Sequence, residues 1–187
     1  MRTSLISAAA ALIALAVPVA ASAQLPVGAS APTFATRGAL AGKVFSLNLR
    51  SALRRGPVVL YFYPKAFTQG CTLEARAFAE AHDQFAAAGA TVIGMSGDDL
   101  PTLQRFSTEA CASKFAVAAA SPAVIGAYDV ALNRPGMPAG LSNRTSYVIG
   151  RDGKIAFVHS DLDYRDHVRL TLQAVQHMAM GHGARRR

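Results

Sequence analysis

Residues 57–71 read Pro-Val-Val-Leu-Tyr-Phe-Tyr-Pro-Lys-Ala-Phe-Thr-Gln-Gly-Cys, and this stretch decides the fold. Its first part, Pro57–Tyr63, is a continuous apolar run rich in β-branched and aromatic side chains, which is typical of a short, buried central strand. Residues 64–70 contain proline and glycine and interrupt this run. A helical pattern then begins near Cys71 and stops at Gly89. The stretch therefore predicts a buried strand followed directly by a helix.

Strands and helices continue to alternate on both sides of this stretch. The preceding region reads as an extended segment over Gln24–Thr36 and a short strand over Val44–Leu49. Downstream, Asp98-Asp99 followed by Pro101 marks a helix start, and the Asp152-Gly153 step predicts a β-hairpin. We expect further strands at residues 90–95, 115–118, 145–149 and 154–159, and helices from Ser121 to about Tyr128 and over Asp163–Met180.

The order of these elements predicts an α/β fold. The early strand–helix–strand units imply parallel strands, and the hairpin near the end adds an antiparallel part. A mixed central sheet flanked by helices on both faces resembles a thioredoxin-like domain. We assign residues 24–180 to this single domain and read residues 181–187 as a basic, flexible tail.

Composition excludes several classes of protein. The chain has 187 residues, 51% of them hydrophobic, two cysteines and a formal charge of +8. A chain this apolar is not disordered throughout, and two cysteines are too few for a disulfide-dense scaffold or a cysteine-only zinc site. The five histidines show no tight ligand spacing, and no glycine-rich phosphate loop is present. We therefore expect no cofactor, no metal and no nucleic-acid partner.

The first 23 residues have the pattern of a cleaved secretory signal peptide. Arg2 precedes an apolar run over Ala8–Val17, and Ala21-Ser22-Ala23 supplies a small-residue cleavage site. The run is short for a membrane-spanning helix. We expect an exported protein, with no membrane association after cleavage, in a compartment where disulfides persist.

Cys71 occupies a position suited to a reactive thiol. It follows the buried strand and begins a helix, and the free N–H groups and positive dipole end there favour a thiolate. Thr68 stands where a dithiol oxidoreductase carries its first cysteine, so the Cys-x-x-Cys motif is absent. The pattern argues against a thioredoxin-type exchange enzyme and for a single attacking thiolate. Glu74, in the first helical turn, is expected to complement the helix dipole.

The segment from Pro64 to Cys71 matches the P-x-x-x-T-x-x-C motif of the peroxiredoxins. Together with Val58–Lys65 and Cys71–Ala75, it resembles the Q, or bacterioferritin-comigratory-protein, subgroup of that family. The resemblance continues at Val92–Ser96 and returns at Arg144–Ile149. These anchors occur in the family's order, and the resemblance covers most of the chain after residue 23.

The resemblance implies a thiol-dependent peroxidase that reduces hydrogen peroxide or organic hydroperoxides. Cys71 would be the nucleophile, oxidised to a sulfenic acid. Thr68 would hydrogen-bond the thiolate and the incoming peroxide, and Pro64 would shield the sulfur from water. Arg144 would approach the sulfur and hold the peroxide. Gln69 departs from the family, which usually has proline there, and this puts the geometry of the loop in doubt.

The resemblance also implies a resolving thiol. Many members of the subgroup carry one five residues after the nucleophile, where this chain has Arg76, and other members place it in the next helix. Cys111 fits that second arrangement. We therefore expect an intramolecular Cys71–Cys111 disulfide that an external, thioredoxin-like dithiol reopens, in a monomer or weak dimer. The family together with the leader suggests the periplasm.

Two other interpretations stay open at this stage. In the first, Cys71 and Cys111 form a structural disulfide in an exported redox-sensing or binding module. A bridge between them would close a loop worth about 4 kcal/mol in the chain-entropy model. Cys111 also edges an apolar stripe, as an inert core cysteine does. In the second, the protein exchanges disulfides, although the motif for that chemistry is missing.

Overall fold

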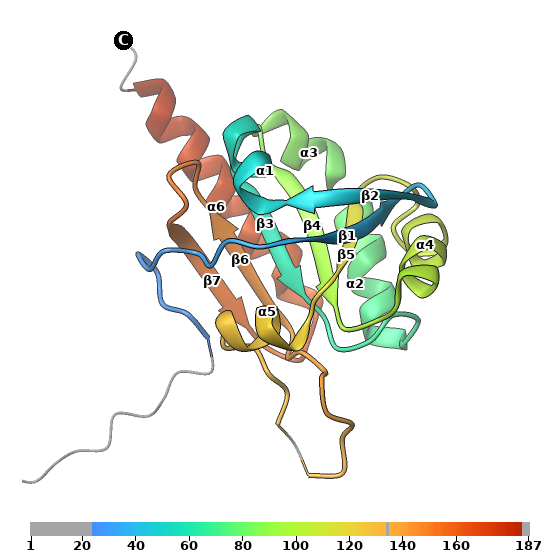
Figure 1. Ribbon diagram of the computed structural model, residues 1–187. Coiled ribbons are helices and arrows are strands. Elements are labelled where there is room, and N and C mark those ends of the chain that lie inside the picture. Colours follow the sequence, from blue (N-terminus) through green and yellow to red (C-terminus); the bar gives the residue numbers. More distant parts are fainter. Residues whose placement is uncertain (1–23, 134, 185–187) are drawn as a thin grey trace, which may run out of the picture.

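The computed structural model describes residues 24–133 and 135–184, and its centre is a seven-stranded mixed sheet. The strand order is β2-β1-β5-β4-β3-β6-β7, and Figure 1 shows the helices packed around it. The strands are β1 (Ala35–Leu40), β2 (Lys43–Asn48), β3 (Val58–Phe62), β4 (Thr91–Ser96), β5 (Ala116–Ala119), β6 (Thr145–Ile149) and β7 (Ile155–Ser160). The helices are α1 (Leu49–Arg55), α2 (Gln69–Glu80), α3 (His82–Ala87), α4 (Leu100–Glu109), α5 (Pro122–Ala127) and α6 (Arg165–Ala184).

The sheet has the mixed character that the sequence predicts. Strands β3, β4 and β5 are parallel neighbours, whereas β3–β6, β6–β7, β1–β5 and β1–β2 pair antiparallel. All five residues of β3 are buried, as its continuous apolar run requires. The hairpin at Asp152-Gly153 is confirmed, and Gly153 adopts a φ of +78° in its turn.

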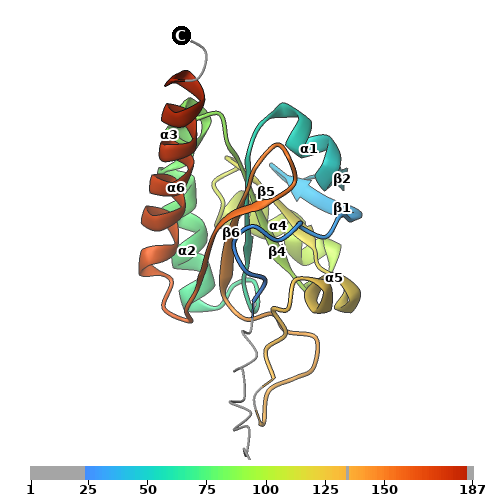
Figure 2. The same cartoon turned by 90° about the vertical axis from the view of Figure 1, so that its left-hand side faces the viewer.

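Helices cover both faces of the sheet, which confirms the predicted layers. Helices α2, α3, α4 and α6 pack on the face that receives Val59, Tyr61 and Tyr63, and α1 and α5 pack on the face that receives Val58, Leu60 and Phe62. Figure 2 views the sheet nearly edge-on, with α6, α2 and α3 on one side and α1 and α5 on the other. Successive side chains along β3 therefore point alternately into two separate hydrophobic cores.

The N-terminal hairpin differs from the sequence-based expectation. An extended segment was expected up to Thr36, but β1 begins at Ala35 and pairs with β2. The connecting turn has Ala41 and Gly42 at positive φ instead of the usual Asn-Gly or Asp-Gly, so the common hairpin pattern is missing. In β1, a side chain at Gly38 would stand 2.6 Å from the Val117 carbonyl oxygen of β5. Close backbone approach, rather than hydrophobic alternation, defines this strand.

Three helical regions also differ from the prediction. Helix α1 was not predicted; the Asn48 side chain caps it by accepting a bond from the Ser51 N–H. The helix expected from Cys71 past Phe85 is divided at Ala81 into α2 and α3, although both parts bury their aromatic side chains in one core. Helix α6 continues to Ala184, beyond the expected end at Met180, because glycine weakens a helix without removing its backbone donors.

Two expectations concern residues outside the described part of the chain. The predicted signal peptide covers residues 1–23, and the last residues of the predicted tail, 185–187, also lie outside it. Among the described helices, none is both long enough and apolar enough to cross a membrane.

Candidate active site

Cys71 lies in the first turn of α2, as predicted. Thr68 is the N-cap residue with extended backbone angles, and its carbonyl accepts the N–H of Thr72 at 2.9 Å. Cys71 is 2% exposed, so its sulfur is almost wholly removed from water. Helix α2 begins at Gln69 without the family's proline, so the departure at this position does not prevent the helix from starting there.

Arg144, immediately before β6, reaches the Cys71 sulfur. Its Nη2 donates to Cys71 Sγ at 3.5 Å, its Nη1 donates to Glu74 Oε2, and its Nε donates to the Leu162 carbonyl at 2.9 Å. The guanidinium is thus held by three partners, and Arg144 as a whole is buried. Gly70 leaves room for it, because a Cβ there would stand 3.3 Å from Nη2. A fixed, desolvated cation beside a thiol stabilises its thiolate and any anion that forms next to it.

Glu74 belongs to this site, which the sequence analysis missed. It is fully buried and pairs with Arg144, instead of lying in water as a complement to the helix dipole. Burial raises the pKa of the Glu74 carboxyl to about 8, against the opposing effect of Arg144. The available clue was spacing: Glu74 follows Cys71 by three residues and so shares its helix face.

Thr68 and Pro64 precede Cys71 in the same loop. Pro64 is half-buried and Thr68 is exposed. The Thr68 hydroxyl donates to the Lys65 carbonyl at 2.9 Å, and within the described residues it makes no hydrogen bond to Cys71. The expected bond from this hydroxyl to the thiolate therefore stays a prediction, for which the hydroxyl must turn away from Lys65.

The loop is fixed by residues to which the sequence analysis gave no role at this site. Asp98 Oδ2 accepts the Ala66 N–H at 2.7 Å and the Ser96 hydroxyl at 2.8 Å. Phe67 adopts a φ of +64°, and its ring packs edge-on against Phe106 of α4. A non-glycine residue in this conformation persists only where its surroundings hold it.

Cys111 lies just past the C-terminus of α4, not within that helix as expected, and it is fully buried. Its thiol is free, as is that of Cys71, and both cysteines belong to the same hydrophobic core cluster. Burial raises the pKa of the Cys111 thiol well above its usual value. Ala112 and Ser113 follow at φ +47° and +59°. The structure therefore brings Cys71 and Arg144 together but does not join Cys71 to Cys111.

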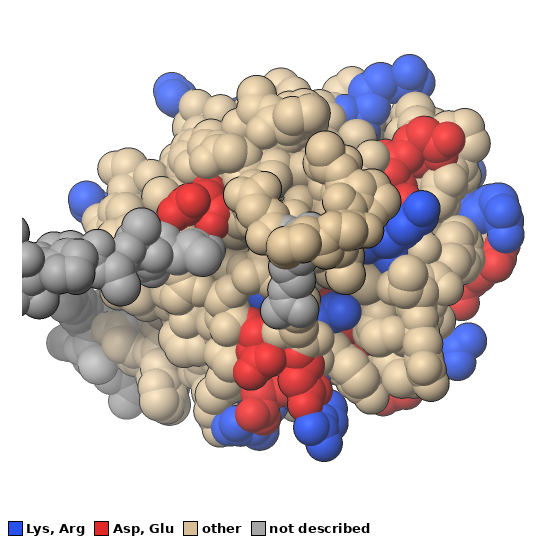
Figure 3. All heavy atoms as spheres, turned by 90° about the horizontal axis from the view of Figure 1, so that it is seen from below, with Lys and Arg blue, Asp and Glu red and all other residues tan. Residues whose placement is uncertain are grey.

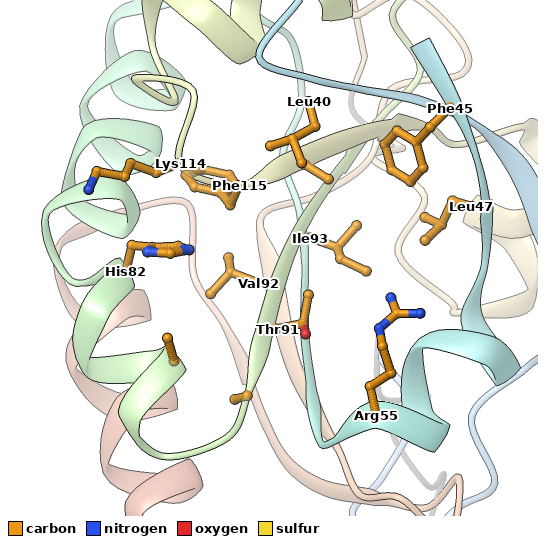
Figure 4. Close-up of a pocket in the computed structure, with 13 residues that line it drawn as sticks. Leu40, Phe45, Leu47, Arg55, His82, Thr91, Val92, Ile93, Lys114 and Phe115 are labelled. Carbon is orange, nitrogen blue, oxygen red and sulfur yellow. The ribbon is translucent and has the colours of Figure 1, made fainter. Parts of the chain in front are cut away.

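A separate hollow lies at the far end of β4. It has a volume of about 290 Å³ and is lined mainly by apolar side chains from β2, β4 and β5. Figure 4 shows Arg55, His82 and Lys114 around these apolar groups. No lining residue belongs to the Cys71 site.

Figure 3 shows the face at which β3 and β4 end and α2 begins. Acidic side chains form a group near its lower centre, and basic side chains are scattered around it. Within residues 24–133 and 135–184, no cluster of three or more histidine, cysteine, aspartate and glutamate side chains could hold a metal ion.

Residues 27–158 match the AhpC/TSA family. Among curated relatives, chloroplastic peroxiredoxin Q of Oryza sativa subsp. japonica is 31% identical over 150 residues. That alignment covers 80% of this chain and 66% of the rice protein, which is just under two thirds of the relative's length.

Solved structures also share the fold. Peroxidoxin BcpB from Mycobacterium tuberculosis is similar with a TM-score of 0.72 and 27% identity, over 81% of this chain and 96% of that chain. A PrxQ variant from Xylella fastidiosa is similar with a TM-score of 0.72 and 23% identity, over 83% of this chain and 98% of that chain, a likeness of fold alone. The thioredoxin-like fold and the resemblance deduced from the cysteine motif are confirmed.

Proposed function

Because the chain belongs to the AhpC/TSA family of peroxiredoxins, we propose that it is a thiol peroxidase that reduces hydrogen peroxide and organic hydroperoxides. The observation that carries this proposal is the Arg144 Nη2 donor, 3.5 Å from the sulfur of a buried cysteine at a helix N-terminus. That arrangement suits a nucleophilic thiolate.

The chemistry begins with attack of the Cys71 thiolate on one oxygen of the peroxide. An S–O bond forms and the O–O bond breaks, so Cys71 becomes a sulfenic acid and the departing oxygen leaves as water or an alcohol after taking up a proton. Negative charge develops on the departing oxygen. Arg144 supplies fixed N–H donors beside the sulfur to stabilise that charge. Thr68, from the start of α2, would orient the peroxide, and Pro64 would limit access of water.

A second thiol completes the cycle. Cys111 attacks the Cys71 sulfenic acid, a disulfide forms and water leaves. Both sulfurs are free and buried, so this step requires local unwinding at the start of α2, around Cys111, or at both places. An external dithiol then reduces the disulfide by exchange. Two residues with strained backbone directly after Cys111 favour movement on that side.

The cellular setting is part of the proposal. The leader over residues 1–23 supports export, and together with the family it supports a periplasmic location. A thioredoxin-like protein would be the reductant, and an intramolecular disulfide requires no second copy, so we propose a monomer or weak dimer. Neither a nucleic acid nor, after cleavage, a membrane takes part.

A redox-sensing or binding module with a structural Cys71–Cys111 bridge is the less favoured candidate. A structural disulfide does not require a buried arginine that donates to one of its sulfurs. In that case the bridge would resist mild reductant and strongly raise the melting temperature, whereas a catalytic disulfide is readily reduced.

Peroxide consumption by the purified chain in the presence of a dithiol reductant tests the proposal. We expect steady turnover that Cys71→Ser abolishes. One equivalent of peroxide should convert the reduced wild-type protein to a monomer with a Cys71–Cys111 disulfide, as found by peptide mass mapping. Undiminished turnover by Cys71→Ser would reject the assignment, and a persistent sulfenic acid would indicate a one-cysteine cycle.

A further inference from the structure

His167 of α6 is a buried, hydrogen-bonded histidine that the proposed reaction does not use. Its side chain is fully buried. Its Nε2 lies 2.9 Å from the Asp161 carbonyl oxygen, and its Nδ1 lies 2.8 Å from the Ser146 hydroxyl. A carbonyl oxygen only accepts, so Nε2 carries a proton, and in the neutral ring Nδ1 accepts the proton of Ser146. The imidazole is therefore fixed at both nitrogens.

The ring edge of His167 closes the space beside Glu74. Nδ1 stands 3.8 Å from Glu74 Oε1, too far for a hydrogen bond. Within the described part of the chain, Oε1 has no hydrogen-bond partner, whereas Oε2 receives Arg144. A buried carboxyl group with a hydrogen bond on one oxygen only is held in place by what packs against the other. His167 supplies that packing.

His167 also holds the backbone that anchors Arg144. It donates to the carbonyl of Asp161, and Arg144 Nε donates to the carbonyl of the next residue, Leu162. The Asp161 N–H in turn donates to the Arg144 carbonyl at 3.2 Å. The His167 imidazole is thus connected to the Arg144 guanidinium in two ways, through the Glu74 side chain and through the backbone of residues 161–162.

We propose that His167 is a positioning residue that holds the Arg144 guanidinium against the Cys71 sulfur through Glu74 and through the 161–162 backbone. This inference rests on the proposed function of Cys71. His167 touches neither the sulfur nor the peroxide, so it acts only by keeping Arg144 in place.

Burial, more than the charged groups around it, keeps His167 neutral at working pH. Glu74 faces it from α2, Arg144 from the start of β6, His159 from β7 at a ring distance of 4.6 Å, and Asp161 from the preceding turn. Burial lowers the pKa of His167 to about 4, against the opposing hydrogen bond to Asp161. Removal of the ring therefore changes packing and hydrogen bonds near Arg144, not a charge.

The test measures alkylation of Cys71 by iodoacetamide between pH 5 and pH 9, in a Cys111→Ser background that leaves one thiol. We expect His167→Ala to lower the rate at pH 6 about tenfold, the range seen for residues that act at a distance, and to leave the rate at pH 9 nearly unchanged. Thr171→Val is the matched control. Thr171 is equally buried one turn further along α6 and its hydroxyl donates to the His167 carbonyl, so Thr171→Val removes a buried hydrogen bond of the same helix without removing the ring.

Coupling to Glu74 gives a second readout. In a Glu74→Gln background, His167→Ala should reduce the rate at pH 6 by a clearly smaller factor, because the carboxyl group that it positions is already gone. If His167→Ala does not fold, His167→Gln keeps the donor to Asp161 but loses the ring edge, and it should shift the profile in the same direction by less. Melting curves establish that each variant is folded.

Overlap of the folded His167 variants with the parent profile would overturn the proposal. So would an equal shift in Thr171→Val, or a fully additive effect with Glu74→Gln. If Cys71 in the parent were no more reactive than the thiol of the unfolded chain, the proposed function itself would fail instead.

Discussion

The two cysteines lie at opposite ends of helices, and this decides how differently they react. Cys71 sits in the first turn of α2, where the helix dipole is positive and Arg144 adds a cation. Cys111 lies past the C-terminus of α4, where the dipole is negative, and burial raises the pKa of its thiol. Both sulfurs share one core, so burial alone does not distinguish them.

This contrast suggests an order of events. A buried thiolate that is stabilised by Arg144 reacts first with a small oxidant. The second thiol is unreactive while buried, and the strained residues after it favour its release once the first has been oxidised. Phe106 joins the two regions, because its carbonyl accepts the N–H of Cys111 and its ring packs on Phe67 of the Cys71 loop.

Replacement of each cysteine by serine should give the largest difference between the two regions in their reaction with peroxide. Cys71→Ser is expected to abolish reaction with peroxide, because no other thiolate is stabilised. Cys111→Ser should still consume one equivalent of peroxide at the wild-type rate and then stop with a sulfenic acid on Cys71. Single-turnover kinetics with mass mapping separate the two. Fast peroxide reduction by Cys71→Ser would mean that the regions are not distinct in this way.

Loss of the cation should have the next largest effect. Arg144→Gln removes a fixed donor beside the sulfur and is expected to lower the rate constant for peroxide about 10²–10³-fold. It also leaves the buried Glu74 carboxyl without its hydrogen-bond partner and is expected to lower the melting temperature. Stopped-flow kinetics and melting curves measure the two effects. Arg50→Gln, at an exposed position of α1, is the control and should change neither rate nor stability.

A smaller change should crowd the same cation. In Gly70→Ala, the added Cβ would stand 3.3 Å from Arg144 Nη2, which is tighter than an ordinary van der Waals contact. The guanidinium must therefore shift by a few tenths of an ångström. We expect the peroxide rate to fall about tenfold, as when a supporting contact is misplaced. Gly126→Ala in α5 meets nothing within 4 Å and should leave the rate unchanged. Equal rates for both variants would show that the position of Arg144 matters little.

The pH dependence of stability should identify the buried groups on the Cys71 side. Glu74 has a raised pKa in the folded state, so the stability that its neutral form contributes is complete below about pH 4.5 and is lost as pH rises through about 8. His167 has a lowered pKa, so its contribution is complete above about pH 6.5 and is lost as pH falls through about 4.

Melting temperatures across this range test both signs. Glu74→Gln should flatten the alkaline loss, and His167→Gln should flatten the acid loss. Burial raises the pKa of the Cys111 thiol well above this range, so Cys111→Ser should keep both slopes. A Glu74→Gln profile that still falls between pH 5 and pH 8 as the wild type does would contradict the assignment.

The smallest expected effect concerns the backbone after Cys111. Ala112→Gly should relieve a left-handed conformation that costs about 1 kcal/mol or more for a residue with a side chain. The reduced form should become slightly more stable, and disulfide formation after a peroxide pulse should slow by up to about fivefold. Ala110→Gly, at a right-handed position, should destabilise the protein instead. Faster disulfide formation in Ala112→Gly would argue against stored strain.

The sequence predicted the parts of this molecule that depend on local patterns. The apolar run before Pro64, the Asp99 cap of α4 and the Asp-Gly turn act through near neighbours, and each is found where expected. Strand β2 was predicted, but its partner β1 was missed because β1 depends on close approach of Gly38 to β5. Glu74 and His167 were missed because their partners lie far away in the chain and only the fold brings them to Arg144.

The order of oxidation is the central claim, and trapping the first oxidised sulfur tests it directly. The reduced chain is given one equivalent of hydrogen peroxide together with dimedone, which captures sulfenic acids, and the adduct is located by peptide mass mapping. The account predicts dimedone on Cys71 and none on Cys111, with the Cys71 adduct increasing in Cys111→Ser. Dimedone on Cys111, or equal adducts on both cysteines, would contradict it.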